Sequence, residues 1–258
     1  MSIRPPTAAG SAWIGRTIGV LRSLFIYRRP GRQRGLQRMY GPFVHAGDLV
    51  FDIGAHVGDR TRAFAALGAR VIALEPQPQL LPWLRRAVRG RPGIAIRREA
   101  AGPAPGSARL QVSRRHPTVS SASRSWVRSL GQRNRSFRHV RWDDEITVPM
   151  ITLDQLIEEY GTPRFCKIDV EGLEAEVLRG LSHPIPALSF EFVAGALEVT
   201  ADCLQQLASL GTYEFNLIRG ERRTFEFHDW QSSTEILTWL EAHGERLGSG
   251  DLYARLCP

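Results

Sequence analysis

Short apolar segments alternate with helix-patterned segments along most of this chain of 258 residues, beginning near residue 48. The segments between the apolar runs place hydrophobic residues at helical spacing. Alternation of this order is typical of a largely parallel sheet covered by helices on both faces. It predicts an α/β fold whose ligand site lies beyond the carboxyl ends of the strands. The predicted strands are 48–53, 69–76, 93–99, 108–112, 146–150, 164–170, 187–192, 212–218, 224–227 and 251–256, and the predicted helices are 12–27, 78–89, 153–160, 174–181, 199–210 and 233–243.

A glycine-containing turn follows the first predicted strand and leads into a helical pattern through Phe64 and Leu67. Asp52 stands near the end of that strand, and Gly54 and Gly58 follow it with three residues between them. A turn without side chains lets a ligand approach the backbone. The spacing differs from the G-x-G-x-x-G pattern of dinucleotide sites, so it disfavours an NAD-dependent oxidoreductase, which we keep as an alternative.

Glu75 ends the second predicted strand, 21 residues after Gly54. A carboxylate at that place can accept hydrogen bonds from both hydroxyls of a ribose. The glycine turn and this acid together suit a nucleoside cofactor that lacks a diphosphate, and S-adenosylmethionine fits. The alternative is an ordinary turn between a strand and a helix.

Three charged residues, Lys167, Asp169 and Glu171, alternate at the carboxyl end of the strand predicted over 164–170. The twofold repeat of a strand places them on one face of the sheet. Charges at such a place are costly unless they are paired or used. Two interpretations stay open. Lys167 and Asp169 form an ion pair with Glu171 at a helix N-terminus, or the two acids surround a reacting centre.

Four ordered segments within residues 48–192 resemble the FkbM family of methyltransferases. They are residues 51–61, 73–76, 151–154 and 165–180. The resemblance implies a Rossmann-like class I methyltransferase fold with a seven-stranded sheet and S-adenosylmethionine as the methyl donor. It also implies transfer to an oxygen, often a hydroxyl of a sugar, a lipid or a polyketide.

The resemblance also assigns residues to the cofactor. Asp52, Gly54 and Gly58 would line its methionine end, and Glu75 its ribose. The family commonly has Asn at the position of His56. The expected cofactor-binding set is Asp52, Gly54, Ala55, His56, Gly58, Thr61, Glu75 and Pro76.

A neutral hydroxyl needs its proton removed, and a general base contributes roughly 10²–10⁴-fold to such a reaction. The candidates are Asp169, Glu171, Glu191 and His116, and we favour Asp169 because it lies on the strand beside the glycine turn. Lys167 joins the catalytic set because it is the single lysine in a chain that otherwise uses Arg. Metal binding through Asp169 and Glu191 is an alternative, but no spacing of His and carboxylate residues supports it, so we expect no metal.

The net charge of +8 suggests a nucleic-acid partner, but its distribution argues against one. Residues 1–40 hold eight Arg and no acid, and residues 91–141 hold twelve Arg and one acid. Residues 142–258 hold eight basic and 21 acidic residues. We therefore expect a small-molecule, glycan or lipid hydroxyl acceptor and no nucleic acid. A non-enzymatic polyanion-binding module that uses residues 91–141 is a further alternative.

We divide the chain into a basic helical extension, 1–44, and a methyltransferase domain, 45–258, with an insertion or lid over 100–145. Three scattered cysteines favour a reducing compartment, and no apolar run reaches the roughly 18–20 residues that span a bilayer. We therefore expect a cytoplasmic protein. Residues 12–29 have the pattern of a basic amphipathic helix, which would dock on the domain or contact anionic lipid.

Overall fold

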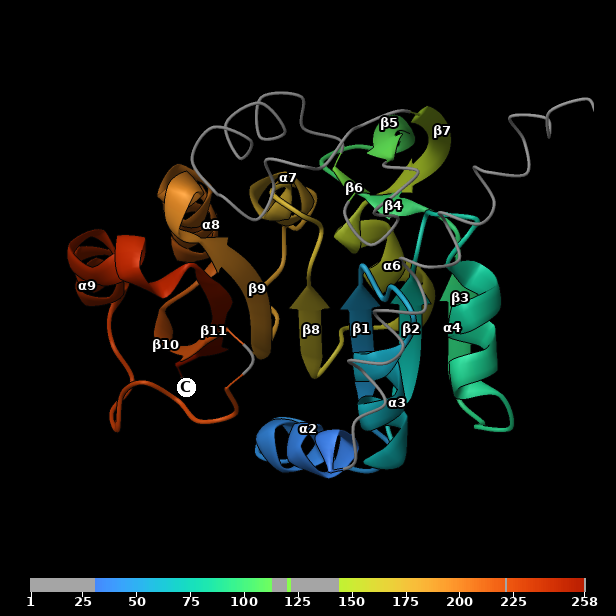
Figure 1. The fold of residues 1–258 in the computed structure, drawn as a ribbon, viewed down its shortest axis with the longest axis horizontal. Coiled ribbons are helices and arrows are strands. Elements are labelled where there is room, and N and C mark those ends of the chain that lie inside the picture. Colours follow the sequence, from blue (N-terminus) through green and yellow to red (C-terminus); the bar gives the residue numbers. More distant parts are fainter. Residues whose placement is uncertain (1–30, 113–119, 122–143, 221, 258) are drawn as a thin grey trace, which may run out of the picture.

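Figure 1 shows a computed structural model of the chain, which describes residues 31–112, 120–121, 144–220 and 222–257. A seven-stranded sheet lies at its centre in the order β10-β11-β9-β8-β1-β2-β3. Neighbouring strands pair in parallel except at β11, which is antiparallel to β9 and β10. This arrangement confirms the predicted Rossmann-like α/β fold. The strands are β1 (Leu49–Ile53), β2 (Arg70–Leu74), β3 (Ile94–Arg97), β8 (Phe165–Ile168), β9 (Ala187–Val193), β10 (Tyr213–Arg219) and β11 (Ser249–Leu256).

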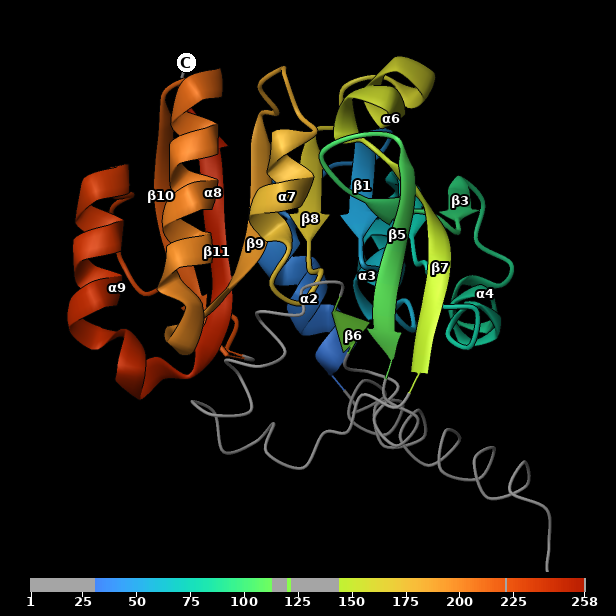
Figure 2. The same cartoon turned by 90° about the horizontal axis from the view of Figure 1, so that it is seen from above.

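Helices cover both faces of this sheet, as Figure 1 and Figure 2 show. Helices α6, α7, α8 and α9 pack on one face, around Leu178 and Phe190. Helices α2, α3 and α4 pack on the other. Capping boxes at Thr152 and Ser232 begin α6 and α9, so the local sequence sets where these helices start. The helices are α2 (Arg32–Tyr40), α3 (Asp59–Ala66), α4 (Leu81–Val88), α6 (Leu153–Tyr160), α7 (Glu174–Arg179), η2 (Ala194–Ala196), α8 (Leu197–Leu210) and α9 (Ser233–Leu247).

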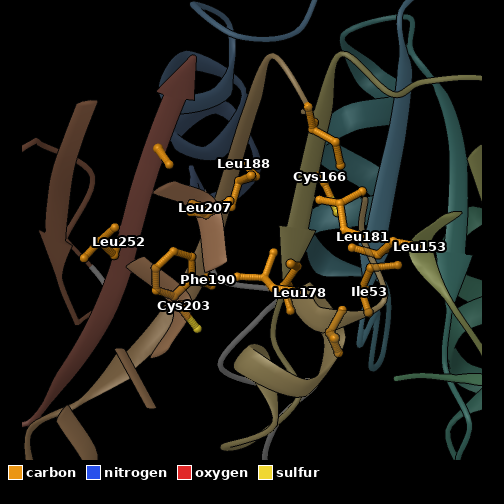
Figure 3. Packing of buried hydrophobic residues seen from close by; sticks show 14 of the residues in the cluster. Ile53, Leu153, Cys166, Leu178, Leu181, Leu188, Phe190, Cys203, Leu207 and Leu252 are labelled. Carbon is orange, nitrogen blue, oxygen red and sulfur yellow. The ribbon is translucent and has the colours of Figure 1, made fainter. Parts of the chain in front are cut away.

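Two cysteines belong to the larger apolar core. Figure 3 shows Cys166 and Cys203 among leucines and Phe190, and both thiols are buried and free. Burial raises the pKa of both thiols. They therefore act as small apolar side chains rather than as nucleophiles.

A second, four-stranded sheet accounts for the described part of the predicted insertion, with the order β4-β7-β5-β6. Figure 1 shows it above β1 and β2. β5 and β7 pair antiparallel from Gly106 with Met150 to Val112 with Asp144. The insertion therefore adds strands of its own beside the main sheet. These are β4 (Ala100–Ala101), β5 (Gly106–Val112), β6 (Ser120–Ser121) and β7 (Asp144–Ile151).

The strand predicted over 224–227 is wrong, because this segment is a loop along the edge strand β10. The Glu226 N–H donates to the carbonyl of Leu217 at 2.9 Å. The side-chain amide of Asn216 donates to the Phe227 carbonyl at 2.9 Å. A side chain thus replaces the ladder of backbone bonds that a strand would form.

Helix α2 is an element that the sequence analysis missed. Leu36 and Tyr40 are buried on one side of it, while Arg34 and Arg38 are exposed. The arginine-rich composition hides this apolar stripe. Gly31, in the left-handed region with a φ of 79°, stands at its N-cap and marks the start of the helix.

Some predictions lie outside the described residues, namely the helix over 12–27, the lipid contact of 12–29 and most of the lid. Within the described part of the chain, no helix combines the length and the apolar character that crossing a membrane requires. The boundaries of the two predicted domains stay a prediction.

Candidate functional site

A cavity of about 270 Å³ lies at the carboxyl ends of β1, β2 and β8. This is the edge at which a largely parallel sheet binds its ligand, and where the sequence places the site. The small sheet closes the cavity with Leu110 and Met150. Seven of the predicted site residues line it: Gly54, Ala55, His56, Glu75, Pro76, Asp169 and Glu171.

Gly54 brings two of these strand ends together. Its φ is 80°, and a Cβ atom there would lie 1.9 Å from the carbonyl oxygen of Asp169. The Asp169 N–H in turn donates to the carbonyl of Ile53 at 3.0 Å. Only glycine permits this close approach of the two backbones.

Glu75 links the turn to β2. One carboxylate oxygen accepts from the His56 N–H at 2.8 Å and the other from the Gln77 N–H at 2.9 Å. Burial raises the pKa of Glu75 to about 7, although these two N–H groups lower it. Each carboxylate oxygen has a second lone pair, so Glu75 can still accept bonds from a ligand in the cavity.

Three residues of the predicted cofactor set, Asp52, Gly58 and Thr61, lie outside the cavity wall. The Thr61 hydroxyl donates to Asp52 at 2.5 Å, and both side chains are buried. This bond ties the end of β1 to α3. A Cβ atom on Gly58 would lie 2.7 Å from Leu84 of α4. These contacts shape the turn, and the part of the three residues in cofactor binding stays a prediction.

Lys167 also lies behind the cavity wall, with its side chain fully buried. Its ammonium contacts Asp169 at 3.1 Å and Asp251 of β11 at 3.2 Å. Burial opposes the charge, but the two carboxylates outweigh it and raise the pKa of Lys167. The ammonium therefore stays charged and holds Asp169 in place.

Asp169 stays ionised because of its cationic neighbours. Burial alone would raise its pKa, but Lys167 and Arg60 hold it below the ordinary value. Asp169 therefore offers a carboxylate to the cavity at neutral pH, as a proton acceptor requires.

Two further carboxylates lie close to Asp169. One carboxylate oxygen of each of Asp169, Glu171 and Glu191 lies within 4.8 Å of the other two. Burial and the neighbouring acids raise the pKa of Glu171 and Glu191 well above the ordinary value. Such a group shares protons rather than ionising completely. The expected absence of a metal stays a prediction.

Among the residues that the structure describes, His56 is the one histidine in the cavity wall. Its φ is 53°, a left-handed conformation that only a few non-glycine residues adopt. Burial lowers the pKa of its imidazole to about 4, so the ring is neutral at physiological pH. The other candidate histidine, His116, lies outside the described residues.

The sequence analysis missed several wall residues. Glu99 is the second residue after β3, so its place beside the cavity is predictable from the carboxyl end of that strand once the strand is known. Asp59 and Arg60 begin α3 beside the glycine turn. Leu110 and Met150 belong to the small sheet, whose position above the cavity has no signal in the local sequence.

Comparisons with known proteins agree with this geometry. The family model described as Methyltransferase FkbM domain matches residues 52–247. The hexuronic acid methyltransferase AglP of Haloferax volcanii is 28% identical over 148 residues, or 57% of this chain. The chain spans about half, 55%, of the length of that curated relative. An O-methyltransferase from Bacillus cereus, solved in complex with SAH, is similar in fold, with a TM-score of 0.50 and 12% identity over 99% of this chain and 94% of that one.

Proposed function

Because this chain belongs to the FkbM methyltransferase family, we propose that it transfers the methyl group of S-adenosylmethionine to a hydroxyl of a sugar or a glycolipid. The observation that carries the proposal is the joint position of Gly54, Glu75 and Asp169 around one cavity. The sugar substrate in the name of the Haloferax volcanii relative supports this class of acceptor.

The cavity wall suits this cofactor. The backbone of Gly54 is open to the cavity because the residue has no side chain, and a Cβ atom there would have no room. Glu75 offers carboxylate lone pairs that a ribose can use, and Leu110 and Met150 offer apolar surface for a purine. When bound, S-adenosylmethionine supplies an electrophilic methyl group on a sulfonium.

The acidic residues at the end of β8 can accept the proton of the acceptor hydroxyl. With the cofactor bound, the hydroxyl oxygen of the acceptor would form a bond to the methyl carbon as the bond from that carbon to sulfur breaks. The hydroxyl proton passes to Asp169, which Lys167 keeps ionised. Glu171 and Glu191 lie close enough to share that proton. The remaining rate comes from orientation and from the exclusion of water.

Transfer of labelled methyl groups to an extract tests the acceptor class. The extract is then split into glycan, lipid, protein and nucleic-acid fractions. We expect label in the glycan or glycolipid fraction. Label confined to nucleic acid or protein contradicts the acceptor class, and binding of NAD in place of S-adenosylhomocysteine by calorimetry contradicts the cofactor.

Asp169→Asn tests the proposed base. Loss of the carboxylate removes the proton acceptor, so kcat falls by roughly 10²–10⁴-fold, while the affinity for S-adenosylhomocysteine stays close to that of the wild type. Glu158→Gln is the matched control, because Glu158 is an exposed acid on α6. Full turnover by Asp169→Asn refutes the role of Asp169.

We also propose that the protein works in the cytoplasm. Cys166, Cys203 and Cys257 are free thiols in the structure, which supports a reducing compartment.

A further inference from the structure

Helix α2 precedes the residues that the family model matches, yet it contacts a residue of the cavity wall. Arg32 Nε donates to Asp59 Oδ2 at 2.6 Å. The side-chain amide of Gln33 donates to Asp59 Oδ1 at 2.7 Å and to the Asp59 carbonyl at 3.1 Å. Both carboxylate oxygens of Asp59 are therefore held by α2.

Asp59 stands where the glycine turn becomes a helix. It is the first residue of α3, and Gly58 before it has a φ of 83° and provides no side-chain cap. Asp59 also lines the cavity. Because the turn lies between β1 and Asp59, fixing Asp59 fixes the end of the turn that β1 does not hold.

The contact between Arg32 and Asp59 is buried, so it can fix the position of Asp59 relative to α2. The side chains of Arg32 and Asp59 are 6% and 5% exposed, so water competes little for their bond. Apolar packing holds the rest of α2, since Leu36 and Tyr40 belong to the same buried cluster as Phe64 of α3. Helix α2 therefore acts as a rigid support for the start of α3.

We propose that Arg32 and Gln33 are positioning residues for the cofactor, which they affect through Asp59 and the turn over residues 54–58. This inference rests on the proposed function. It assigns a task in cofactor binding to a helix outside the matched family domain. The resemblance to the FkbM family implies that the methionine half of the cofactor lies at this turn, so we expect the support to matter most for that half.

Calorimetry on the chain of 258 residues tests this inference, with S-adenosylhomocysteine and adenosine as the two probes. We expect Arg32→Ala to weaken S-adenosylhomocysteine binding by about tenfold, as the loss of a buried charged hydrogen bond does. Adenosine binding should change much less. Arg34→Ala is the matched control, because Arg34 is exposed on the same helix and the change in charge is identical.

Two further variants keep the test informative if Arg32→Ala fails to fold. Gln33→Ala preserves the ion pair and should weaken S-adenosylhomocysteine binding to a smaller extent, and Arg32→Lys should restore part of the lost affinity. In a protein that already carries Asp59→Asn, Arg32→Ala should lower the affinity for S-adenosylhomocysteine only slightly further, since the contact between residues 32 and 59 is already weakened.

The outcomes separate the two proposals. If the wild type binds no S-adenosylhomocysteine, the proposed function has failed, and the inference falls with it. If the wild type binds but Arg32→Ala lowers only the melting temperature and leaves the affinity unchanged, the contact is merely structural and the inference is wrong. An equal loss of affinity for S-adenosylhomocysteine and for adenosine also contradicts the inference, because the turn would then not act on the methionine half in particular.

Discussion

Gly54 and Gly90 have nearly the same backbone conformation in different surroundings. Their φ angles are 80° and 75°, but a Cβ atom would meet the Asp169 carbonyl oxygen at 1.9 Å in one case and nothing within 4 Å in the other. We expect Gly90→Ala to cost about 1–2 kcal/mol, for the left-handed conformation alone. Gly54→Ala should lower the free energy of unfolding by more than this and should also abolish cofactor binding. Urea unfolding and calorimetry measure both effects, and equal losses in the two variants speak against the close approach.

Glu75 gives the cofactor-free protein a specific dependence on pH. Burial raises its pKa from 4.5 to about 7. The folded state therefore binds more protons than the unfolded state across that range, and wild-type stability falls relative to Glu75→Gln as the pH rises from about 4.5 to about 7. Thermal unfolding of the two proteins at several pH values measures this. A constant difference in Tm, or one of opposite trend, contradicts the raised pKa.

At the scale of single residues, strand ends made much of the cavity wall predictable. Gly54, Glu75 and Asp169 follow apolar runs directly, so their place needs no tertiary information. The position of Asp52 and Thr61 behind the cavity wall was not predictable, because a polar side chain under a turn and one facing the cavity have the same local sequence. Arg32 could not be found either, since its partner Asp59 is 27 residues away.

At the scale of elements, the hydrophobic pattern predicted most strands and helices of the main sheet within a few residues. The hydrophobic pattern failed to predict helix α2, and it wrongly predicted a strand over 224–227. Helix α2 owes its burial to an apolar stripe interrupted by arginines, and the loop over 224–227 has strand-like residues but bonds to the side chain of Asn216. In both cases tertiary contacts outweigh local composition.

Leu36→Ala tests whether α2 belongs to the fold or to a separate extension. Leu36 is 3% exposed and packs in the cluster shared with α3. Its truncation should lower the free energy of unfolding by about 2–5 kcal/mol in a single cooperative transition. Arg38→Ala, on the exposed side of the same helix, should have little effect. Separate unfolding of α2, or no loss of stability, supports an independent extension instead.

At the scale of the whole molecule, Lys167 joins the site strand β8 to β11. Its ammonium lies between Asp169 and Asp251, and its side chain is fully buried. Lys167→Arg places a larger group in this space, which costs about 1–3 kcal/mol of stability. It also shifts Asp169, so turnover falls. Arg85→Lys, an exchange at an exposed position of α4, is the control. Unchanged turnover and Tm in Lys167→Arg contradict the requirement for a compact ammonium.

The place of β11 has a consequence for the order in which the molecule assembles during synthesis. β10 has β11 as its strand neighbour in the sheet, although β11 is made after it. Asp251, the second carboxylate on Lys167, is made 84 residues after the lysine itself. A nascent chain that ends before β11 thus contains every described residue of the cavity wall without the strand that joins β10 to the sheet. Lys167 therefore gains its second carboxylate only after β11 has been made, and contacts between residues so far apart in sequence form slowly in folding.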